Sequence, residues 1–145
     1  MKLRRNTHIV GVMTPFPHSI SHDATPRAAA EQMQQESFHH LPVMKEGILI
    51  GILEERDLIL GERLQQSFPE LGPLRVEDLC SRNPLIVEDK ALLGDVCALI
   101  DGHSSDAALV VRDGKLVGIF TSHDAVRLLH EVIGDSGGDI PDQIA

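Results

Sequence analysis

Two short stretches of the sequence carry the residues best suited to binding a ligand. In GIFTSHD, residues 118–124, an apolar run stops at Thr121 and reaches Asp124 three positions later. If a helix begins there, its free N–H groups and the positive end of its dipole suit a phosphate. The aspartate can accept hydrogen bonds from both hydroxyls of a ribose. The stretch GILEERD, residues 51–57, has the same outline with Glu54 in place of the threonine.

The same spacing also has a purely structural interpretation. Thr-x-x-Asp resembles a helix capping box, in which Thr121 caps the helix and Asp124 is favourable in its first turn. The letters SHD at 122–124 spell a hydrolase triad, but consecutive residues at a helix start point in different directions and cannot converge on a substrate. Catalysis is therefore not expected, and ligand binding and helix capping both stay open.

The two stretches belong to an internal repeat. A shift of 67 positions aligns the two halves of the chain without a gap over some 50 residues. The identical pairs are Pro17 and Pro84, Ala24 and Ala91, Val43 and Val110, Gly47 and Gly114, Leu49 and Leu116, Gly51 and Gly118, Ile52 and Ile119, and Asp57 and Asp124.

Each half predicts the same order of elements, namely strand, helix, strand, strand, helix. In the first half Thr25 is a plausible N-cap and Pro26 suits the first helical position. Gly47 and Gly114 predict the turns of two hairpins. The predicted elements are 19–21, 25–35, 41–44, 48–53 and 55–60 in the first half, and 85–87, 92–101, 108–111, 115–120 and 122–133 in the second.

A three-stranded sheet with helices on one face cannot cover its own apolar surface at this size, so two halves should pack about a pseudo-twofold axis. The expected fold class is α+β, an α/β repeat of two β-α-β-β-α units. The expected organisation is a first repeat at 1–60, a linker at 61–75, a second repeat at 76–134 and a mobile C-terminal tail at 135–145.

Both halves contain further recognisable motifs between about Val10 and Ile133, namely VMTPFPHSI, LCSRNPLIV, TPRAAAEQM, HHLPVMKEGILIGIL and GIFTSHD. In these motifs and their order the chain resembles a tandem pair of CBS domains, named after cystathionine β-synthase and also called a Bateman module. This resemblance implies a regulatory module that binds an adenosine-containing ligand, such as AMP, ADP, ATP or S-adenosylmethionine, in clefts between the repeats. It also implies association of two chains into a flat homodimer.

The resemblance further implies that each cleft combines the G-h-h-T-x-x-D stretch of one repeat with a wall from the other. The first cleft would offer a ribose acceptor, hydroxyls, an aromatic edge and two imidazoles that can carry charge near a phosphate. Its expected ligand-binding residues are Thr25, Phe38, His39, His40, Pro42, Ile119, Thr121 and Asp124.

The second cleft is expected to be degenerate. It would combine Glu54, Asp57, Leu92, Ser105 and Asp106. Like charges about 4 Å apart at an effective dielectric near 20 repel by about 4 kcal/mol, which is enough to suppress polyphosphate binding. The hypothesis is one competent site per chain, while the acidic cleft remains able to accept an uncharged nucleoside or a divalent cation.

The composition and residue spacing argue against several classes of partner and cofactor. With 13 basic and 22 acidic residues the formal charge is −9, which disfavours nucleic acid. No apolar run approaches the ~20 residues needed to cross a bilayer. Cys80 and Cys97 lack metal-binding or redox spacing, so reduced thiols and a cytoplasmic location are expected. Adjacent His39 and His40 point to opposite faces of a strand, so neither a metal nor a catalytic cofactor is expected.

Apolar helix faces of a two-repeat disc need cover, and a homodimer with twofold symmetry would provide it. The alternative to ligand sensing is a scaffold with empty clefts, which acts through dimerisation or through docking to an unidentified protein target. A hydrolase or metalloenzyme is the third and least favoured class.

Overall fold

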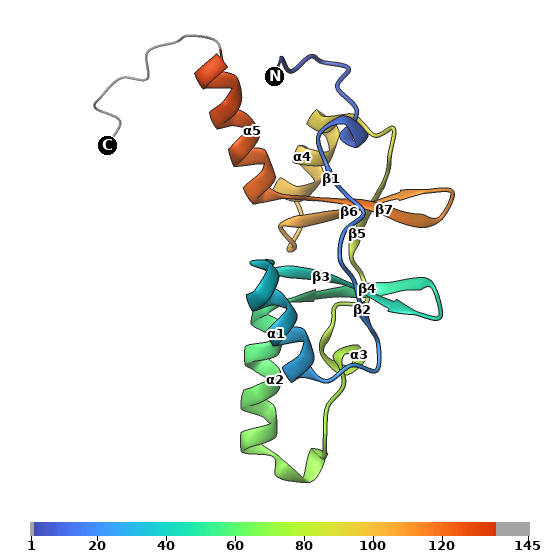
Figure 1. Ribbon diagram of the computed structural model, residues 1–145, viewed down its shortest axis with the longest axis vertical. Coiled ribbons are helices and arrows are strands. Elements are labelled where there is room, and N and C mark those ends of the chain that lie inside the picture. Colours follow the sequence, from blue (N-terminus) through green and yellow to red (C-terminus); the bar gives the residue numbers. More distant parts are fainter. Residues whose placement is uncertain (1, 136–145) are drawn as a thin grey trace, which may run out of the picture.

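The computed structural model describes residues 2–135 and contains two small sheets, stacked one above the other (Figure 1). The predicted tail, residues 135–145, lies outside the described residues apart from Asp135, which ends the last helix. Both halves contain the predicted order of elements, so the expected mixed α/β repeat fold is confirmed. The first half contains β2 (Ile20–Ser21), α1 (Pro26–Glu36), β3 (His40–Lys45), β4 (Ile48–Glu54) and α2 (Glu55–Ser67). The second half contains β5 (Leu85–Glu88), α4 (Leu93–Asp101), β6 (Ala107–Arg112), β7 (Lys115–Thr121) and α5 (Ser122–Asp135).

Local chemistry explains the main boundaries. The hydroxyl of Thr25 accepts a hydrogen bond from the Ala28 N–H at 3.1 Å, which caps α1 with Pro26 at its first position. Each hairpin turns through two residues of positive φ, Glu46 with Gly47 and Asp113 with Gly114. Turns of this geometry match the right-handed twist of the flanking strands.

The segments that lead into each repeat cross over to the opposite sheet. In β1 (Thr14–Pro15), Thr14 pairs with Ile119 of β7, and at the equivalent place Ser81 pairs with Ile52 of β4. The sheet of the second half is therefore four-stranded, in the order β1-β7-β6-β5, whereas that of the first half is three-stranded, β2-β3-β4. The expected three strands gain a fourth because the N-terminal segment lies against this edge.

The crossing segments also fill the opposite cores. Ile9, in a 3-10 helix at Ile9–Gly11, packs in the core of the second half. Its equivalent Val76, in α3 (Val76–Leu79), packs in the core of the first half. The Ile9 N–H donates to the carbonyl of Ala91 and the Val76 N–H to that of Ala24. These reciprocal contacts give the two halves a pseudo-twofold relation.

Two repeat-equivalent glycines permit this crossing. A Cβ at Gly51 would meet the carbonyl oxygen of Ser81, and a Cβ at Gly118 would meet the sulfur of Met13. Both glycines therefore lie where the lead segment of the other repeat approaches the strand too closely for a side chain.

A small third core joins the sheets. It consists of Ile52, Ala107 and Leu109, with Leu49, Leu116 and Ile119 packed against them. Figure 1 shows that the long helices lie beside this junction at one end of the strands, while the hairpin loops extend at the other.

The segment expected to link the repeats is partly helical. Helix α2 continues to Ser67, a 3-10 helix follows at Pro69–Leu71, and α3 begins at Val76. The domain boundaries drawn from the sequence stay a prediction. Within residues 2–135, no helix has the length and apolar character that crossing a membrane requires.

Candidate functional site

A cluster of polar side chains joins the two repeats at the cleft predicted to be degenerate. Glu54 is the last residue of β4, and it is buried, with only 8% of its surface exposed. The hydroxyl of Ser105, from the loop before β6, donates to Glu54 Oε1 at 3.0 Å. Arg56 lies on the other side, with its Nε 2.6 Å from Glu54 Oε2. Glu54 of the first repeat is thus hydrogen-bonded to Ser105 of the second. The sequence analysis expected this cleft to combine residues of both repeats.

His40 belongs to the same cluster. Its Nε2 lies 2.6 Å from Asp106 Oδ1 and 3.9 Å from Glu54 Oε1. The sequence prediction assigned His40 to the first cleft, but the structure places its imidazole in the second. The reason is strand register, because His40 pairs with Glu54 across β3 and β4, and paired residues project from the same face.

Asp57 and Leu92 complete the residues predicted for this cleft but do not join the cluster. Asp57 accepts a hydrogen bond from the Glu54 N–H at 2.8 Å, and burial raises the pKa of its carboxyl. Leu92 precedes α4 and forms a β-bridge with His8. Asp57 therefore caps α2, and Leu92 packs beside the N-terminal segment.

In the first cleft, Thr121 and Asp124 form a helix cap. Asp124 Oδ2 accepts from the Thr121 N–H at 2.9 Å and lies 3.1 Å from the Thr121 hydroxyl, and the Asp124 N–H donates to that hydroxyl at 3.2 Å. The other carboxylate oxygen is 3.8 Å from the guanidinium of Arg127. The capping interpretation is thus realised, and Oδ1 keeps capacity to accept further hydrogen bonds.

The opposite wall of the first cleft is held by its own repeat. Exposed His39 lies with its Nδ1 2.8 Å from Glu55 Oε2, and the ring of Phe38 is 5.4 Å from that of His18. Thr25 caps α1 at the far end of the helix from Phe38. Throughout residues 2–135, no hydrogen bond or ion pair joins any of these three residues to Thr121 or Asp124.

One difference between the two clefts lies beside the helix starts, at the small residue Ala107. Ala107 pairs with Thr121 across β6 and β7, in the same way that His40 pairs with Glu54. Where the second cleft has an imidazole that bridges the repeats, the first cleft therefore has a methyl group. The predicted apolar residues lie close by: Ile119 packs on the core that contains Ala107, and Pro42 is fully buried.

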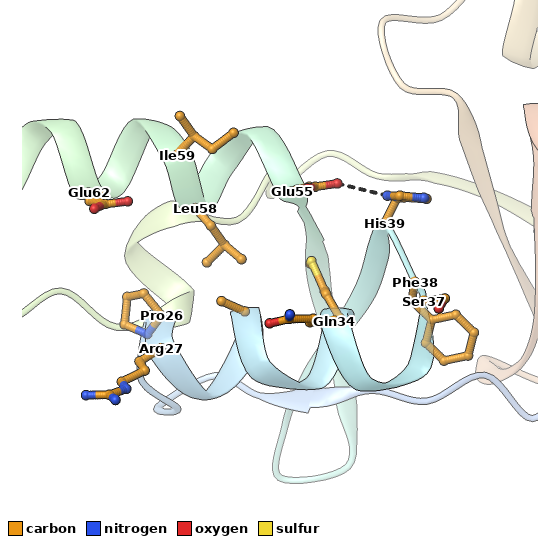
Figure 2. Close-up of a pocket in the computed structure, with 12 residues that line it drawn as sticks. Pro26, Arg27, Gln34, Ser37, Phe38, His39, Glu55, Leu58, Ile59 and Glu62 are labelled. Atoms are coloured by element: carbon orange, nitrogen blue, oxygen red, sulfur yellow. Dashed lines mark hydrogen bonds and ion pairs between the residues drawn. The ribbon is translucent and has the colours of Figure 1, made fainter.

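A separate groove was not predicted from the sequence. It measures about 840 Å³, lies between α1 and α2, and is open to solvent. Figure 2 shows Leu58 reaching from α2 towards α1, with the His39–Glu55 pair at one end. The equivalent groove between α4 and α5 is smaller, about 370 Å³. Amphipathic spacing of the helices was the available signal, but it cannot distinguish a core stripe from the floor of a groove.

Known proteins share both the sequence pattern and the fold. The family model of the CBS domain matches residues 9–61 and 76–131. A homoserine O-acetyltransferase of Methanococcoides burtonii is 29% identical over 126 residues, a match that covers 86% of this chain and 24% of that protein. The chain spans about a quarter of the length of the curated relatives it matches, 28% of one and 24% of the other.

Solved structures give the same result. CBSX2 in complex with AMP is 27% identical, with a TM-score of 0.74 over 87% of this chain and 98% of that chain. The CBS domain pair of MJ0100, in complex with 5'-methylthioadenosine and S-adenosyl-L-methionine, is 22% identical, with a TM-score of 0.73 over 86% and 97%. The two matched segments, the reciprocal packing of the halves and these neighbours agree with the resemblance read from the sequence. The chain belongs to the CBS domain family, as a tandem pair of repeats.

Proposed function

We propose that the chain is a regulatory module that binds one adenosine-containing ligand, in the first cleft. The observation that carries this proposal is the absence of a bond across this cleft. Phe38 and Ala107 stand where the second cleft has Ser105 and His40, and among the described residues no hydrogen bond or ion pair joins Thr121 or Asp124 to the opposite repeat. The cleft therefore has unbridged walls and an apolar floor, as a ligand site needs.

The proposed contacts follow from the chemistry of the groups. Asp124 Oδ1, which lies 3.8 Å from the guanidinium of Arg127, accepts the ribose hydroxyls. The N–H groups of Ser122 and Asp124 at the start of α5 already donate to the Asp106 carbonyl and the Thr121 hydroxyl, so the helix would act on a phosphate through the positive end of its dipole. His39 lies on the opposite wall in an ion pair with Glu55, and a bound phosphate would compete with that carboxylate for the imidazole. The AMP bound by CBSX2 supports this class of ligand.

The proposed role is regulation and not catalysis. Thr121 and Asp124 are engaged in capping α5, and within residues 2–135 neither is hydrogen-bonded to a histidine that would act as a base. A ligand that touches both repeats changes their relative arrangement only if it binds one arrangement more tightly than another. The partner that receives the signal would be a second copy of the chain or a separate protein.

A second candidate function is association without a ligand. Helices α2 and α5 carry large apolar side chains that are half exposed or more, namely Ile59, Leu60, Val126 and Leu129. Their exposure favours a surface that another chain covers. A scaffold of this kind would dimerise or dock with empty clefts.

Calorimetric titration with AMP, ADP, ATP and S-adenosylmethionine tests the proposal. One of them should saturate near one site per chain, and at 100 times its dissociation constant it should stabilise the fold by about 2.7 kcal/mol. Asp124→Ala should weaken binding by about 1.5–3 kcal/mol, roughly 10- to 150-fold, because a charge-assisted bond is lost.

The matched control is Asp57→Ala, which removes the equivalent cap from α2 and should leave the affinity unchanged. Saturation at two equal sites, or equal losses in the two variants, would contradict the one-site proposal. No heat and no thermal shift with any of the four compounds would favour the scaffold.

A further inference from the structure

The cluster in the second cleft has the composition of a metal site. His40, Glu54 and Asp106 each offer one possible ligand atom, and these atoms all lie within 4.8 Å of one another. One imidazole nitrogen and two carboxylate oxygens are donors that Zn²⁺ and related ions accept. We propose that the second cleft binds a divalent transition-metal ion through these three residues.

The spacing suits a small ion. Zinc bonds of 2.0–2.2 Å in a tetrahedron place the ligand atoms roughly 3.3–3.6 Å apart. In the structure, His40 Nε2 is 2.6 Å from Asp106 Oδ1 and 3.9 Å from Glu54 Oε1, distances on either side of that value. A rotation of the Asp106 side chain, which is 61% exposed, is enough to open the shorter distance.

Neighbouring side chains orient the proposed metal ligands and set the charge around them. Glu54 is held by the Ser105 hydroxyl at one oxygen and by Arg56 at the other, which fixes the direction of its carboxylate as outer partners do in metal centres. Two carboxylates against one guanidinium leave a net negative charge facing the imidazole. The side chains of His40 and Glu54 are 12% and 11% exposed, so the ion would be shielded on one side and reached past Asp106.

The other cleft lacks this set. The repeat equivalents of His40, Glu54 and Asp106 are Ala107, Thr121 and His39, and Ala107 has no donor side chain. The ion would therefore bind once per chain and only at the second cleft. Since Glu54 and Asp106 come from different repeats, it would also tie the repeats together beside the first cleft.

The experiment titrates Zn²⁺ into the untagged full chain in competition with a chromogenic chelator. One ion per chain is expected. His40→Ala and Asp106→Asn should each weaken binding by at least the ~10- to 100-fold that loss of an outer-shell partner costs. Co²⁺ in place of Zn²⁺ should give the strong visible absorption of a tetrahedral site, and both variants should lose it.

His39→Ala is the matched control, because His39 is both the neighbour of His40 and the repeat equivalent of Asp106. It should bind Zn²⁺ as the wild type does. Asp106→Asn changes a largely exposed side chain, so the test remains decisive even if His40→Ala fails to fold. Absence of one-to-one binding, or wild-type affinity in Asp106→Asn, would overturn the proposal.

The inference is independent of the nucleotide site. Asp106→Asn should leave titrations with AMP unchanged, and Asp124→Ala should leave Zn²⁺ binding unchanged. Failure of one proposal is therefore distinguishable from failure of the other.

Discussion

The two clefts have equivalent backbones and different side-chain chemistry. Both are built by a strand that ends at a helix start, and both helices are capped by the equivalent aspartates Asp57 and Asp124. In the second cleft, Glu54 is bridged to the opposite repeat by Ser105, whereas Thr121 has no such bridge among the described residues. The two repeats thus share one backbone arrangement, but one bonds its polar side chain to the opposite repeat, whereas the other bonds Thr121 to Asp124 within the same repeat.

The side chains of the second cleft give a different physical reason for the expected difference in nucleotide binding between the clefts. The sequence predicted that crowded carboxylates repel an anion from the second cleft. The structure pairs those carboxylates, Glu54 with Arg56 and Asp106 with His40. Under the one-site proposal, side chains that bond across the second cleft would oppose a nucleotide there, in addition to charge.

The largest expected effect comes from giving the first cleft the residue of the second. Thr121→Glu introduces a carboxylate where the positions of Ser105, Arg56 and His40 are taken by Phe38, His123 and Ala107. An uncompensated charge about 4 Å from a phosphate, at an effective dielectric near 20, costs about 4 kcal/mol. We expect the affinity for AMP to fall roughly 1000-fold in calorimetric titration.

The reverse change, Glu54→Thr, serves as the control. It alters the second cleft and should leave the affinity of the first cleft for AMP unchanged. A similar loss in both variants would show that the clefts are not distinct in the way their side chains indicate.

The two close-approach glycines provide the next comparison. Gly51→Ala places a Cβ against the carbonyl oxygen of Ser81, which cannot move without the backbone, whereas Gly118→Ala places it against the flexible side chain of Met13. Overpacking costs typically about 1–3 kcal/mol. We expect about 3 kcal/mol for Gly51→Ala and about 1 kcal/mol for Gly118→Ala in urea unfolding. Equal losses would mean that the two crossings are equally rigid.

The position of His40 illustrates how far the sequence could predict this site. The strands, helices and hairpin turns were predictable because Gly47, Gly114 and the residues around them repeat in register. With a regular ladder from the turn, His40 would oppose Leu53. A β-bulge between Val43 and Met44 shifts the register so that His40 opposes Glu54. Such a bulge adds one residue to one strand, here Ile50. The neighbouring Gly51, a glycine inside a strand, was the available sequence signal, but it does not give the position of the extra residue.

The crossing of the N-terminal segment was likewise beyond prediction. Ile9 begins a short apolar run at 9–13 that has too few residues to show a helix or strand period, and its burial depends on a core from the other half of the chain. By contrast, the family resemblance implied a crosswise geometry in which Glu54 and Ser105 line one cleft, although it did not predict the hydrogen bond between them. Local patterns predict elements, while contacts between repeats need the repeat relation.

A smaller effect is expected from the hydroxyl that bridges the repeats. Ser105→Ala removes a hydrogen bond to the buried carboxylate of Glu54, and bonds to charged groups contribute about 1.5–3 kcal/mol. We expect a loss of about 2 kcal/mol in urea unfolding. The neighbouring Ser104→Ala, at an exposed position, should change stability by less than about 0.5 kcal/mol. A Ser105 variant as stable as the wild type would show that the bridge is not needed to close the second cleft.

The smallest effects are expected from two aspartates whose pKa values shift in opposite directions. Burial raises the pKa of Asp57, which caps α2 in the first half. In the second half, the hydrogen bond from Arg112 Nε, at 2.6 Å, lowers the pKa of Asp89. Unfolded aspartate titrates near about 3.9. Asp57 therefore stabilises the fold most below that pH, and this contribution is lost as the pH rises through its folded pKa. The contribution of Asp89 is present above about pH 3.9 and is lost as the pH falls through its folded pKa.

Urea unfolding of Asp57→Asn and Asp89→Asn between pH 3 and pH 7 tests these signs. Relative to the wild type, Asp57→Asn should gain stability as the pH rises, because the wild type loses the contribution of a carboxyl that is costly to ionise in its buried position. Asp89→Asn should fall behind the wild type over the same rise, and added salt should reduce that difference because the Asp89–Arg112 pair is partly exposed. If the stability of both variants relative to the wild type changed in the same direction with pH, the assigned pKa shifts would be wrong. Burial disfavours the charged form of Asp57, whereas the Arg112 guanidinium favours that of Asp89, so the two carboxyls must respond to protons in opposite ways.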